Sequence, residues 1–175
     1  MNFERLPTKL EDIVLIEPTV HGDERGFFVE TFRQDALGGL GIDADFVQDN
    51  HSRSGARVLR GIHRQAEQAK LVRCPSGRIW DVAVDLRPDS PTYKQWEGYE
   101  LNGTKHHQLF IPDGFGHGFC VLSDSADVIY RVSSYYDPEL ETGIAWDDPE
   151  IGIEWPIDDP VLSERDKSAP KLAEA

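Results

Sequence analysis

Short apolar runs separated by turn residues set the hydrophobic pattern of this chain. Strands are predicted at 13–16, 26–32, 46–50, 58–63, 71–74, 78–86, 96–101, 108–111, 119–122 and 128–132. Clusters such as Pro75-Ser76-Gly77 and Asn102-Gly103 end the runs, and short helices are predicted only at 34–40 and 163–167. Many short strands at this spacing favour an all-β sandwich, jelly roll or small barrel with short peripheral helices.

The clearest alternation runs from 78 to 86. Trp80, Val82 and Val84 fall on one face of this segment, and Asp81 and Asp85 fall on the other. A period of two predicts a strand with one face in the core and one face in solvent. Because no repeat or linker interrupts the pattern elsewhere, one domain spanning 1–175 is expected.

Composition and charge narrow the classes of function. A chain of 175 residues with 39% hydrophobic content can bury a sizeable core. Its formal net charge of -14 argues against binding nucleic acid or an anionic membrane over the surface at large. Cys74 and Cys120 have neither disulfide-framework nor zinc spacing, and no apolar run is long enough to span a membrane. A reduced cytoplasmic protein is therefore expected.

One basic stretch stands out against the acidic background. Between 53 and 78 the only acid is Glu67, and the basic residues are Arg53, Arg57, Arg60, Arg64, Lys70, Arg73 and Arg78. A cationic segment in an acidic protein indicates an anionic ligand. His63 lies within the stretch, and an imidazole could move a proton beside such a ligand. We therefore expect the stretch to line a pocket.

A metal site is the first chemistry to test. Residues 112–117 read P-x-G-x-x-H and end at His117, which resembles half of the metal-binding signature of cupins. The other half needs an H-x-H pair, and here the sequence reads His63-Arg64-Gln65. The second histidine is missing and a guanidinium would repel a divalent cation. The expectation is a cupin-like barrel with no metal.

Eight segments resemble one known family. They are G-D-E-R-G-F-F-V-E (22–30), F-V-Q-D-N-H-S-R-S (46–54), V-L-R-G-I-H (58–63), Q-A-K-L-V-R (68–73), D-V-A-V-D-L-R (81–87), S-P-T (90–92), I-P-D-G-F-G-H-G-F (111–119) and W-D-D-P-E-I-G-I-E-W-P (146–156). In this order they resemble the dTDP-4-dehydrorhamnose 3,5-epimerases over nearly the whole chain. The resemblance implies a cupin-type jelly roll that forms homodimers and uses no metal or organic cofactor.

The resemblance also implies a reaction and its catalytic residues. The substrate would be a dTDP-4-keto-6-deoxyhexose of a deoxysugar pathway such as dTDP-rhamnose synthesis. Its C4 keto group acidifies the hydrogens on C3 and C5, so a base can form an enolate and an acid can return a proton to the opposite face. By the match to the family, His63 is the base, Asp166 orients it, Tyr130 is the proton donor and Lys70 polarises the C4 oxygen.

Further positions are expected to bind the nucleotide sugar. Arg25 and Arg60 suit the diphosphate, because a guanidinium fork fits phosphate oxygens. Phe28 and Tyr135 are the aromatic candidates for stacking on the base. The remaining positions that the family uses for ligand contacts are Glu30, Gln48, Asn50, His117, Glu141 and Arg165.

Arg64 leaves the outcome of the reaction open. The family usually has an aromatic or aliphatic residue after the catalytic histidine, and alternation predicts that Arg64 points away from His63. An epimerase acting only on C3 or only on C5, or on a sugar carried by another nucleotide, would use largely the same residues. Two alternatives from other classes remain: a metal-dependent cupin oxygenase or isomerase, and a non-catalytic nucleotide-sugar-binding barrel.

Overall fold

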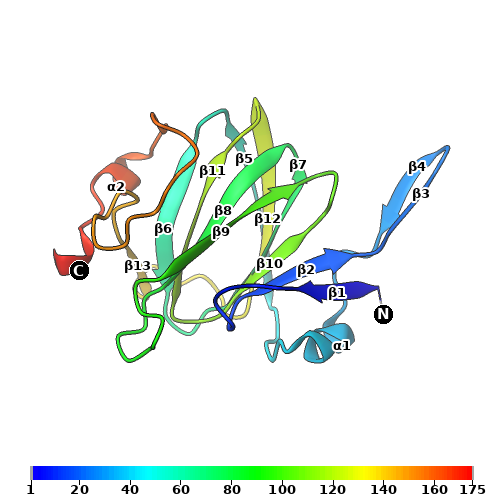
Figure 1. Ribbon diagram of the computed structural model, residues 1–175, viewed down its shortest axis with the longest axis horizontal. Coiled ribbons are helices and arrows are strands. Elements are labelled where there is room, and N and C mark those ends of the chain that lie inside the picture. The colour runs from blue at the N-terminus through cyan, green and yellow to red at the C-terminus, as the bar shows by residue number, and fades with distance from the viewer. Residues whose placement is uncertain (1, 175) are drawn as a thin grey trace.

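The computed structural model describes residues 2–174, in which two antiparallel sheets face each other and one hairpin projects from the body (Figure 1). The elements are β1 (Phe3–Leu6), β2 (Val14–Pro18), β3 (Val20–Asp23), β4 (Gly26–Val29), α1 (Gln34–Leu37), a 3₁₀ turn (Gly38–Leu40), β5 (Gln48–Gly55), β6 (Leu59–Gln65), β7 (Lys70–Ser76), β8 (Arg78–Asp85), β9 (Trp96–Asn102), β10 (Gln108–Ile111), β11 (Phe115–Val121), β12 (Ser125–Val132), β13 (Glu141–Gly143), α2 (Glu164–Lys167) and a 3₁₀ turn (Leu172–Glu174). None of the helices in this part of the chain is long and apolar enough to cross a membrane.

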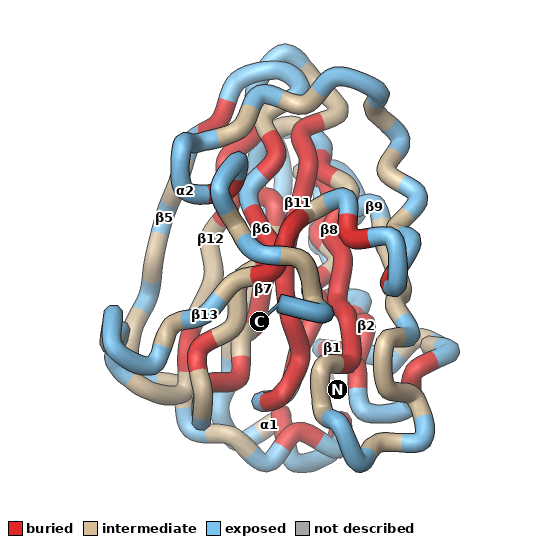
Figure 2. Tube along the Cα trace, turned by 90° about the vertical axis from the view of Figure 1, so that its left-hand side faces the viewer, coloured by how far each residue is buried: buried red, intermediate tan, exposed pale blue. Residues whose placement is uncertain are grey.

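The strand order is that of a jelly roll. One sheet has the order β1-β2-β10-β7-β12-β5 and the other has β13-β6-β11-β8-β9, so most neighbours in a sheet are distant in sequence. The core lies between the sheets, where Val72, Ile79 and Leu109 are fully buried. Figure 2 shows this as buried segments running through β8 and β11, with exposed connections at the ends. The predicted all-β class is confirmed.

The prediction that 78–86 is a half-buried strand is wrong. Val82 and Val84, on the outer face of β8, pack against Ile144 and Ile151 of the C-terminal segment, so this face is covered as well. The C-terminal segment lies beside β6 in Figure 1. On the inner face Asp81 is 0% exposed, because a hydrogen bond inside the protein replaces its contact with water. Alternation therefore located the strand, but the face predicted to meet solvent, which carries Asp81 and Asp85, is also buried.

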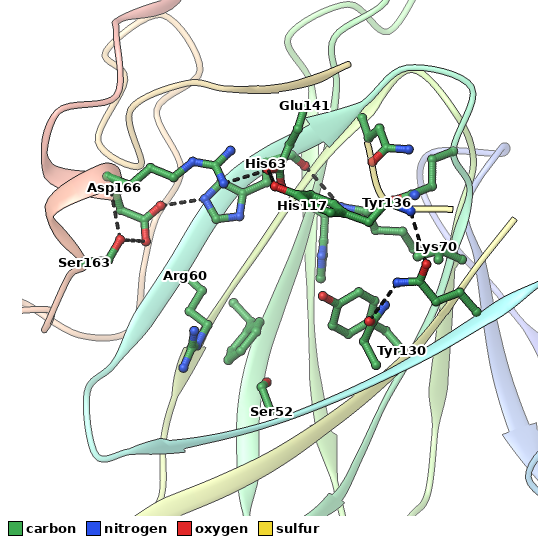
Figure 3. A pocket seen from close by; sticks show the side chains of 17 residues that line it. Ser52, Arg60, His63, Lys70, His117, Tyr130, Tyr136, Glu141, Ser163 and Asp166 are labelled. Carbon is green, nitrogen blue, oxygen red and sulfur yellow. Dashed lines mark hydrogen bonds and ion pairs between the residues drawn. The ribbon is translucent and has the colours of Figure 1, made fainter. Parts of the chain in front are cut away.

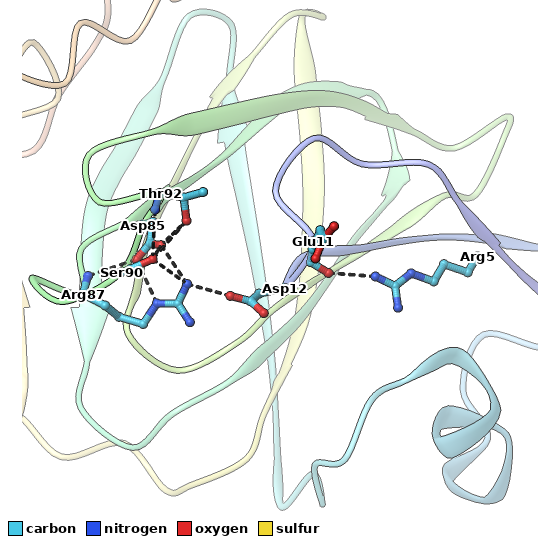
Figure 4. Close-up of polar contacts among 7 residues, drawn as sticks. All are labelled: Arg5, Glu11, Asp12, Asp85, Arg87, Ser90 and Thr92. Atoms are coloured by element: carbon cyan, nitrogen blue, oxygen red, sulfur yellow. Dashed lines mark hydrogen bonds and ion pairs between the residues drawn. The ribbon is translucent and has the colours of Figure 1, made fainter.

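Asp85 is buried in a closed polar network (Figure 4). Its carboxylate accepts hydrogen bonds from Arg87 Nε at 2.9 Å, Thr92 Oγ1 at 2.6 Å and Ser90 Oγ at 2.5 Å. Burial alone would raise the pKa of Asp85, but these hydrogen bonds outweigh it and hold that pKa well below its usual range. Arg87 also reaches Asp12 at 2.6 Å, so the network ties the β8–β9 connection to the N-terminal loop.

Several elements differ from the sequence predictions. β11 begins at Phe115, four residues before the predicted strand, because the glycines of 114–118 were interpreted as a turn. Gly116 lies inside that strand, where an added Cβ would meet Ile62 Cγ2 at 2.5 Å. β1, β3 and β13 were not predicted. β3 and β4 form the projecting hairpin, where Val20 pairs with Val29 and Asp23 with Gly26.

Candidate active site

A cavity of about 460 Å³ opens between the two sheets. Strands β5, β7 and β12 form one wall, and β6, β11 and β13 form the other, with α2 at one side (Figure 3). Most of the residues predicted from sequence line it: Gln48, Asn50, Arg60, His63, Lys70, His117, Tyr130, Glu141, Arg165 and Asp166. Its size suits a small-molecule ligand.

His63 and Asp166 form a hydrogen-bonded pair on one side of the cavity (Figure 3). His63 Nε2 lies 2.6 Å from Asp166 Oδ1, and Asp166 is only 4% exposed. Ser163 caps α2 and donates from Oγ to Asp166 Oδ2 at 2.8 Å. Burial opposes ionisation, but the hydrogen bonds from His63 and Ser163 hold the pKa of Asp166 below its usual range. An ionised carboxylate is therefore positioned to stabilise a protonated imidazole.

The C-terminal segment brings Asp166 to this position. Val161 forms a parallel bridge with Val58, next to the start of β6, and Ala145 N donates to Pro170 O at 2.8 Å. These contacts hold the short helix α2 against β6. From composition alone Asp166 resembles a solvated tail residue. It is buried because the C-terminal segment that carries it packs over β6.

A register shift lets β6 present two functional residues to the cavity. His63 pairs with His117, but Arg60 pairs with Phe119, so one extra residue of β6 is accommodated between the two pairs. Without this bulge, residues three apart in a strand would face opposite sides. Arg64 pairs with Thr142 of β13 and does not line the cavity, as its predicted orientation requires.

Lys70 and Tyr130 stand on the wall opposite His63 (Figure 3). Burial lowers the pKa of Lys70 to about 8, even though the charges of Glu141 and Asp81 favour the ammonium. Lys70 Nζ lies 3.5 Å from the backbone oxygen of His63. Burial and the nearby Glu141 raise the pKa of Tyr130, so its phenol stays protonated at neutral pH. The cavity thus has a candidate base on one side and a cation and a proton donor on the other.

His117 belongs to a second histidine–carboxylate pair. Its Nε2 lies 2.8 Å from Oδ1 of Asp81, which is on the adjacent strand β8. Oδ2 of Asp81 is buried and has no hydrogen-bond partner among the described residues. A carboxylate held this way fixes the orientation of the imidazole toward the cavity.

Tyr136, which the sequence prediction missed, lies at the mouth of the cavity (Figure 3). Its hydroxyl donates to Glu141 Oε2 at 3.1 Å, and Arg165 Nη1 donates to the same oxygen at 2.7 Å. Tyr135, predicted as the aromatic contact, is 71% exposed and does not line the cavity. The two tyrosines are adjacent in a loop, where no strand periodicity distinguishes them.

Three other predicted ligand residues lie away from the cavity of their own chain. Arg25 and Phe28 are exposed on the projecting β3–β4 hairpin, where Arg25 pairs with Asp23. Glu30 follows the hairpin and accepts a hydrogen bond from Asn2 Nδ2 at 2.9 Å. None of the three lines the cavity of the single chain.

The expectation that the basic stretch as a whole lines a pocket is wrong. Of its basic residues only Arg60 and Lys70 line the cavity. Arg53 pairs with Asp127 at 2.6 Å and Arg57 with Asp159 at 3.1 Å, and both arginine side chains are exposed. Some of the acidic residues of the chain therefore form ion pairs with outward-facing arginines.

Other lining residues were not predicted: Ser52, Gln65, Gln68, Phe119, Val132, Tyr136 and Ser163. Gln65 could have been found, because it lies two residues beyond His63 and shares its face.

In residues 2–174 no three or more His, Cys, Asp or Glu side chains gather closely enough to hold a metal ion.

Comparison with known proteins places the chain in a family. A model of the dTDP-4-dehydrorhamnose 3,5-epimerase family matches residues 7–174. The chain belongs to this family. The dTDP-4-dehydrorhamnose 3,5-epimerase of Shigella flexneri is 48% identical over 174 residues, covering 97% of this chain and 96% of the relative. The family predicted from the sequence motifs is confirmed.

Solved structures of family members have the same fold. The Legionella pneumophila dTDP-6-deoxy-D-glucose-3,5-epimerase, in complex with dTDP-4-keto-L-rhamnose, superposes with a TM-score of 0.94 at 46% identity over 98% of this chain and 93% of that one. The Bacillus anthracis dTDP-4-dehydrorhamnose 3,5-epimerase, with TDP and PPi bound, gives 0.94 at 44% identity over 97% and 99%. The predicted cupin-type jelly roll is thereby confirmed.

Proposed function

We propose that the cavity epimerises a dTDP-4-keto-6-deoxyhexose at C3 and C5, as a step of dTDP-rhamnose biosynthesis. The observation that carries this proposal is the His63–Asp166 pair facing Lys70 and Tyr130 across one cavity. Family membership supplies the substrate class, and the geometry supplies a role for each residue.

The first step removes a proton from the carbon next to the keto group. Because His63 Nε2 donates to Asp166, Nδ1 is the nitrogen that can accept this proton. The electron pair of the broken C–H bond moves into the enolate, whose oxygen is stabilised by the ammonium of Lys70. Asp166 stabilises the imidazolium that forms.

The second step returns a proton to the opposite face of the sugar. Tyr130 is the donor, since its phenol is protonated at rest and stands across the cavity from His63. Transfer of its proton to the enolate carbon inverts that carbon and leaves a phenolate. The imidazolium of His63 then releases the abstracted proton to solvent and the phenolate takes a proton from solvent, so both groups return to their starting protonation states. Repeating the cycle at the second carbon completes the 3,5-epimerisation.

Arg60 and Tyr136 hold the nucleotide in this proposal. Arg60 is anchored through Nε to Ser54 Oγ at 3.0 Å, and its remaining guanidinium donors suit the diphosphate. Tyr136 is 55% exposed at the cavity mouth, so its ring offers a face on which a base can stack. It takes the role first assigned to Tyr135.

The protein works as a homodimer in this proposal, in which the β3–β4 hairpin of one subunit reaches the cavity of the other. The hairpin projects from its own body and carries Arg25 and Phe28, the latter 70% exposed (Figure 1). Strand β5 is the edge of its sheet and carries the cavity residues Gln48 and Asn50. An edge strand can pair with a strand from a second copy. Such pairing would bring Arg25 and Phe28 to a cavity they do not line in one chain.

Deuterium exchange tests the proposed reaction. Incubation of the protein with dTDP-4-keto-6-deoxyglucose in D₂O should place deuterium at C3 and C5 of the sugar, as read by NMR. His63→Ala should abolish the exchange. His51→Ala is the matched control, because His51 is exposed on the outer side of β5 and faces Asp127 at 3.7 Å, and it should exchange at the wild-type rate. Absence of exchange in the wild type would contradict the proposal, and label at one carbon alone would reduce it to a mono-epimerase.

A further inference from the structure

The loop that carries Tyr136 is held by glutamine side chains. It lies between β12, which ends at Val132, and β13, which begins at Glu141, and it belongs to neither strand. Backbone groups of such a segment need partners where they are buried. Gln48, Gln65 and Gln68 supply them for residues 134–137.

Gln65 binds the two peptide groups that flank Tyr136. Its Nε2 donates to Tyr135 O at 2.9 Å, and its Oε1 accepts from Asp137 N at 2.9 Å. A residue of a parallel ladder makes this same pair of bonds, to the carbonyl before and the amide after its partner. The Gln65 side chain therefore replaces a neighbouring strand at one position of the loop. It is only 3% exposed, so water does not compete for these bonds.

Tyr136 is held at two further points. Its backbone N donates to Gln48 Oε1 at 3.2 Å, and its hydroxyl donates to Glu141 Oε2 at 3.1 Å. Each of these bonds alone leaves the loop free to pivot, whereas the two bonds of Gln65 fix the direction of the chain through Tyr136. Gln65 also lies two residues beyond His63 on β6, so one strand orients both the proton-abstracting imidazole and the loop with the aromatic ring.

We propose that Gln65 is a positioning residue for the nucleotide: it fixes the Tyr136 ring as the stacking platform for the base at a set distance from His63. This inference rests on the proposed function, in which the substrate carries a nucleotide. It predicts an effect of Gln65 on nucleotide binding and no direct part in proton transfer.

The test is Gln65→Met, which keeps the side-chain length and removes the hydrogen bonds to Tyr135 O and Asp137 N, together with the bond from Nε2 to Ser134 Oγ at 3.2 Å. The Kd for dTDP, measured by calorimetry, and the KM for dTDP-4-keto-6-deoxyglucose should each rise about tenfold, with kcat changed by less than about twofold. In a Tyr136→Ala background the same change should have almost no further effect on the Kd, because the two residues act through one contact. Gln65→Glu, which keeps the acceptor for Asp137 N, should fall between wild type and Gln65→Met and serves if Gln65→Met does not fold.

Hydrogen exchange provides a readout that does not depend on activity. In Gln65→Met the backbone amide of Asp137 should exchange faster than in the wild type. Gln68→Met is the matched control, because Gln68 is similarly buried but bonds only Ser134 in the loop, and it should leave the exchange of Asp137 unchanged.

The outcomes separate this inference from the proposed function. A wild-type Kd for dTDP in Gln65→Met, or a fall in kcat at unchanged Kd, would overturn the positioning role. A wild type that binds dTDP, loses affinity in Gln65→Met and yet exchanges no sugar hydrogen would refute the epimerase proposal while supporting the role of Gln65.

Discussion

The buried ammonium of Lys70 lowers the stability of the folded protein and is suited to the proposed reaction. Its pKa is lowered from 10.5 to about 8 because burial penalises the ammonium. Below pH 8 the folded protein therefore holds a cation in an environment that disfavours it. Between pH 8 and 10.5 the unfolded chain binds more protons than the folded one, so the free energy of unfolding contributed by this group rises with pH. Such a buried cation is useful where an oxyanion develops.

The expected consequence is that Lys70→Met stabilises the protein and inactivates it. The free energy of unfolding at pH 7 should increase by roughly 1 to 3 kcal/mol, because the buried charge is replaced by an apolar chain of similar length. Deuterium exchange at the sugar should be lost. Urea unfolding at pH 7 and pH 10 measures the first effect, and the gain should shrink at the higher pH. A variant less stable than the wild type at pH 7 would contradict the burial of the ammonium.

At the residue scale, the sequence predicted which residues line the cavity better than it predicted which side chains are buried. His63, Lys70 and Tyr130 were assigned by their match to the family, and all three line one cavity. Asp166 could not have been assigned from composition, because its burial depends on a tail that folds back over β6. Tyr136 was missed since loop residues lack the alternation that separates inward from outward side chains.

At the element scale, the bulge in β6 decides which side chains reach the cavity. Gly61 lies at the bulge with φ +135, and an added Cβ would meet Gly118 Cα at 2.5 Å and His117 O at 2.9 Å. Both atoms belong to the backbone of β11 and cannot move aside independently. Glycine is therefore required by backbone conformation and by close approach at the same position.

Gly61→Ala is accordingly expected to lower the free energy of unfolding by about 3 kcal/mol or more, and to weaken dTDP binding by displacing Arg60. Gly55→Ala is the matched control on β5, the strand that precedes β6 in the chain, where an added Cβ meets nothing within 4 Å. It should change stability by less than about 0.5 kcal/mol. Equal denaturation midpoints for the two variants would show that β6 does not pack against β11 as described.

The strands themselves were largely predictable from the sequence, whereas the segments that pack over them were not. β10 coincides with the predicted strand 108–111, because its apolar run is bounded by clear turn residues. The period of β8 was equally clear, but the apolar contacts of Val82 and Val84 lie more than fifty positions later in the chain. Local sequence carries no signal for such a long-range contact. It also gave no sign that the face predicted to meet solvent, which carries Asp81 and Asp85, is buried as well.

At the scale of the whole molecule, the β3–β4 hairpin decides which subunit completes which cavity of the proposed homodimer. Arg25 and Phe28 are predicted ligand contacts, yet in one chain they lie on the projecting hairpin. A hairpin of this kind buries little surface of its own and exposes two phenylalanines, Phe27 and Phe28. A second copy of the chain is the occupant that the proposed homodimer supplies.

A heterodimer with one defect in each subunit distinguishes the arrangements. One subunit carries His63→Ala and the other carries Arg25→Ala with Phe28→Ala, and both homodimers are expected to be nearly inactive. If each hairpin completes the cavity of its partner, one cavity of the heterodimer holds all the substitutions and the other holds none. The purified heterodimer, obtained with two affinity tags, should then show about half of the wild-type activity. If each hairpin serves its own subunit, both cavities remain defective and the heterodimer stays inactive. Recovery of activity therefore requires that the hairpin crosses between subunits.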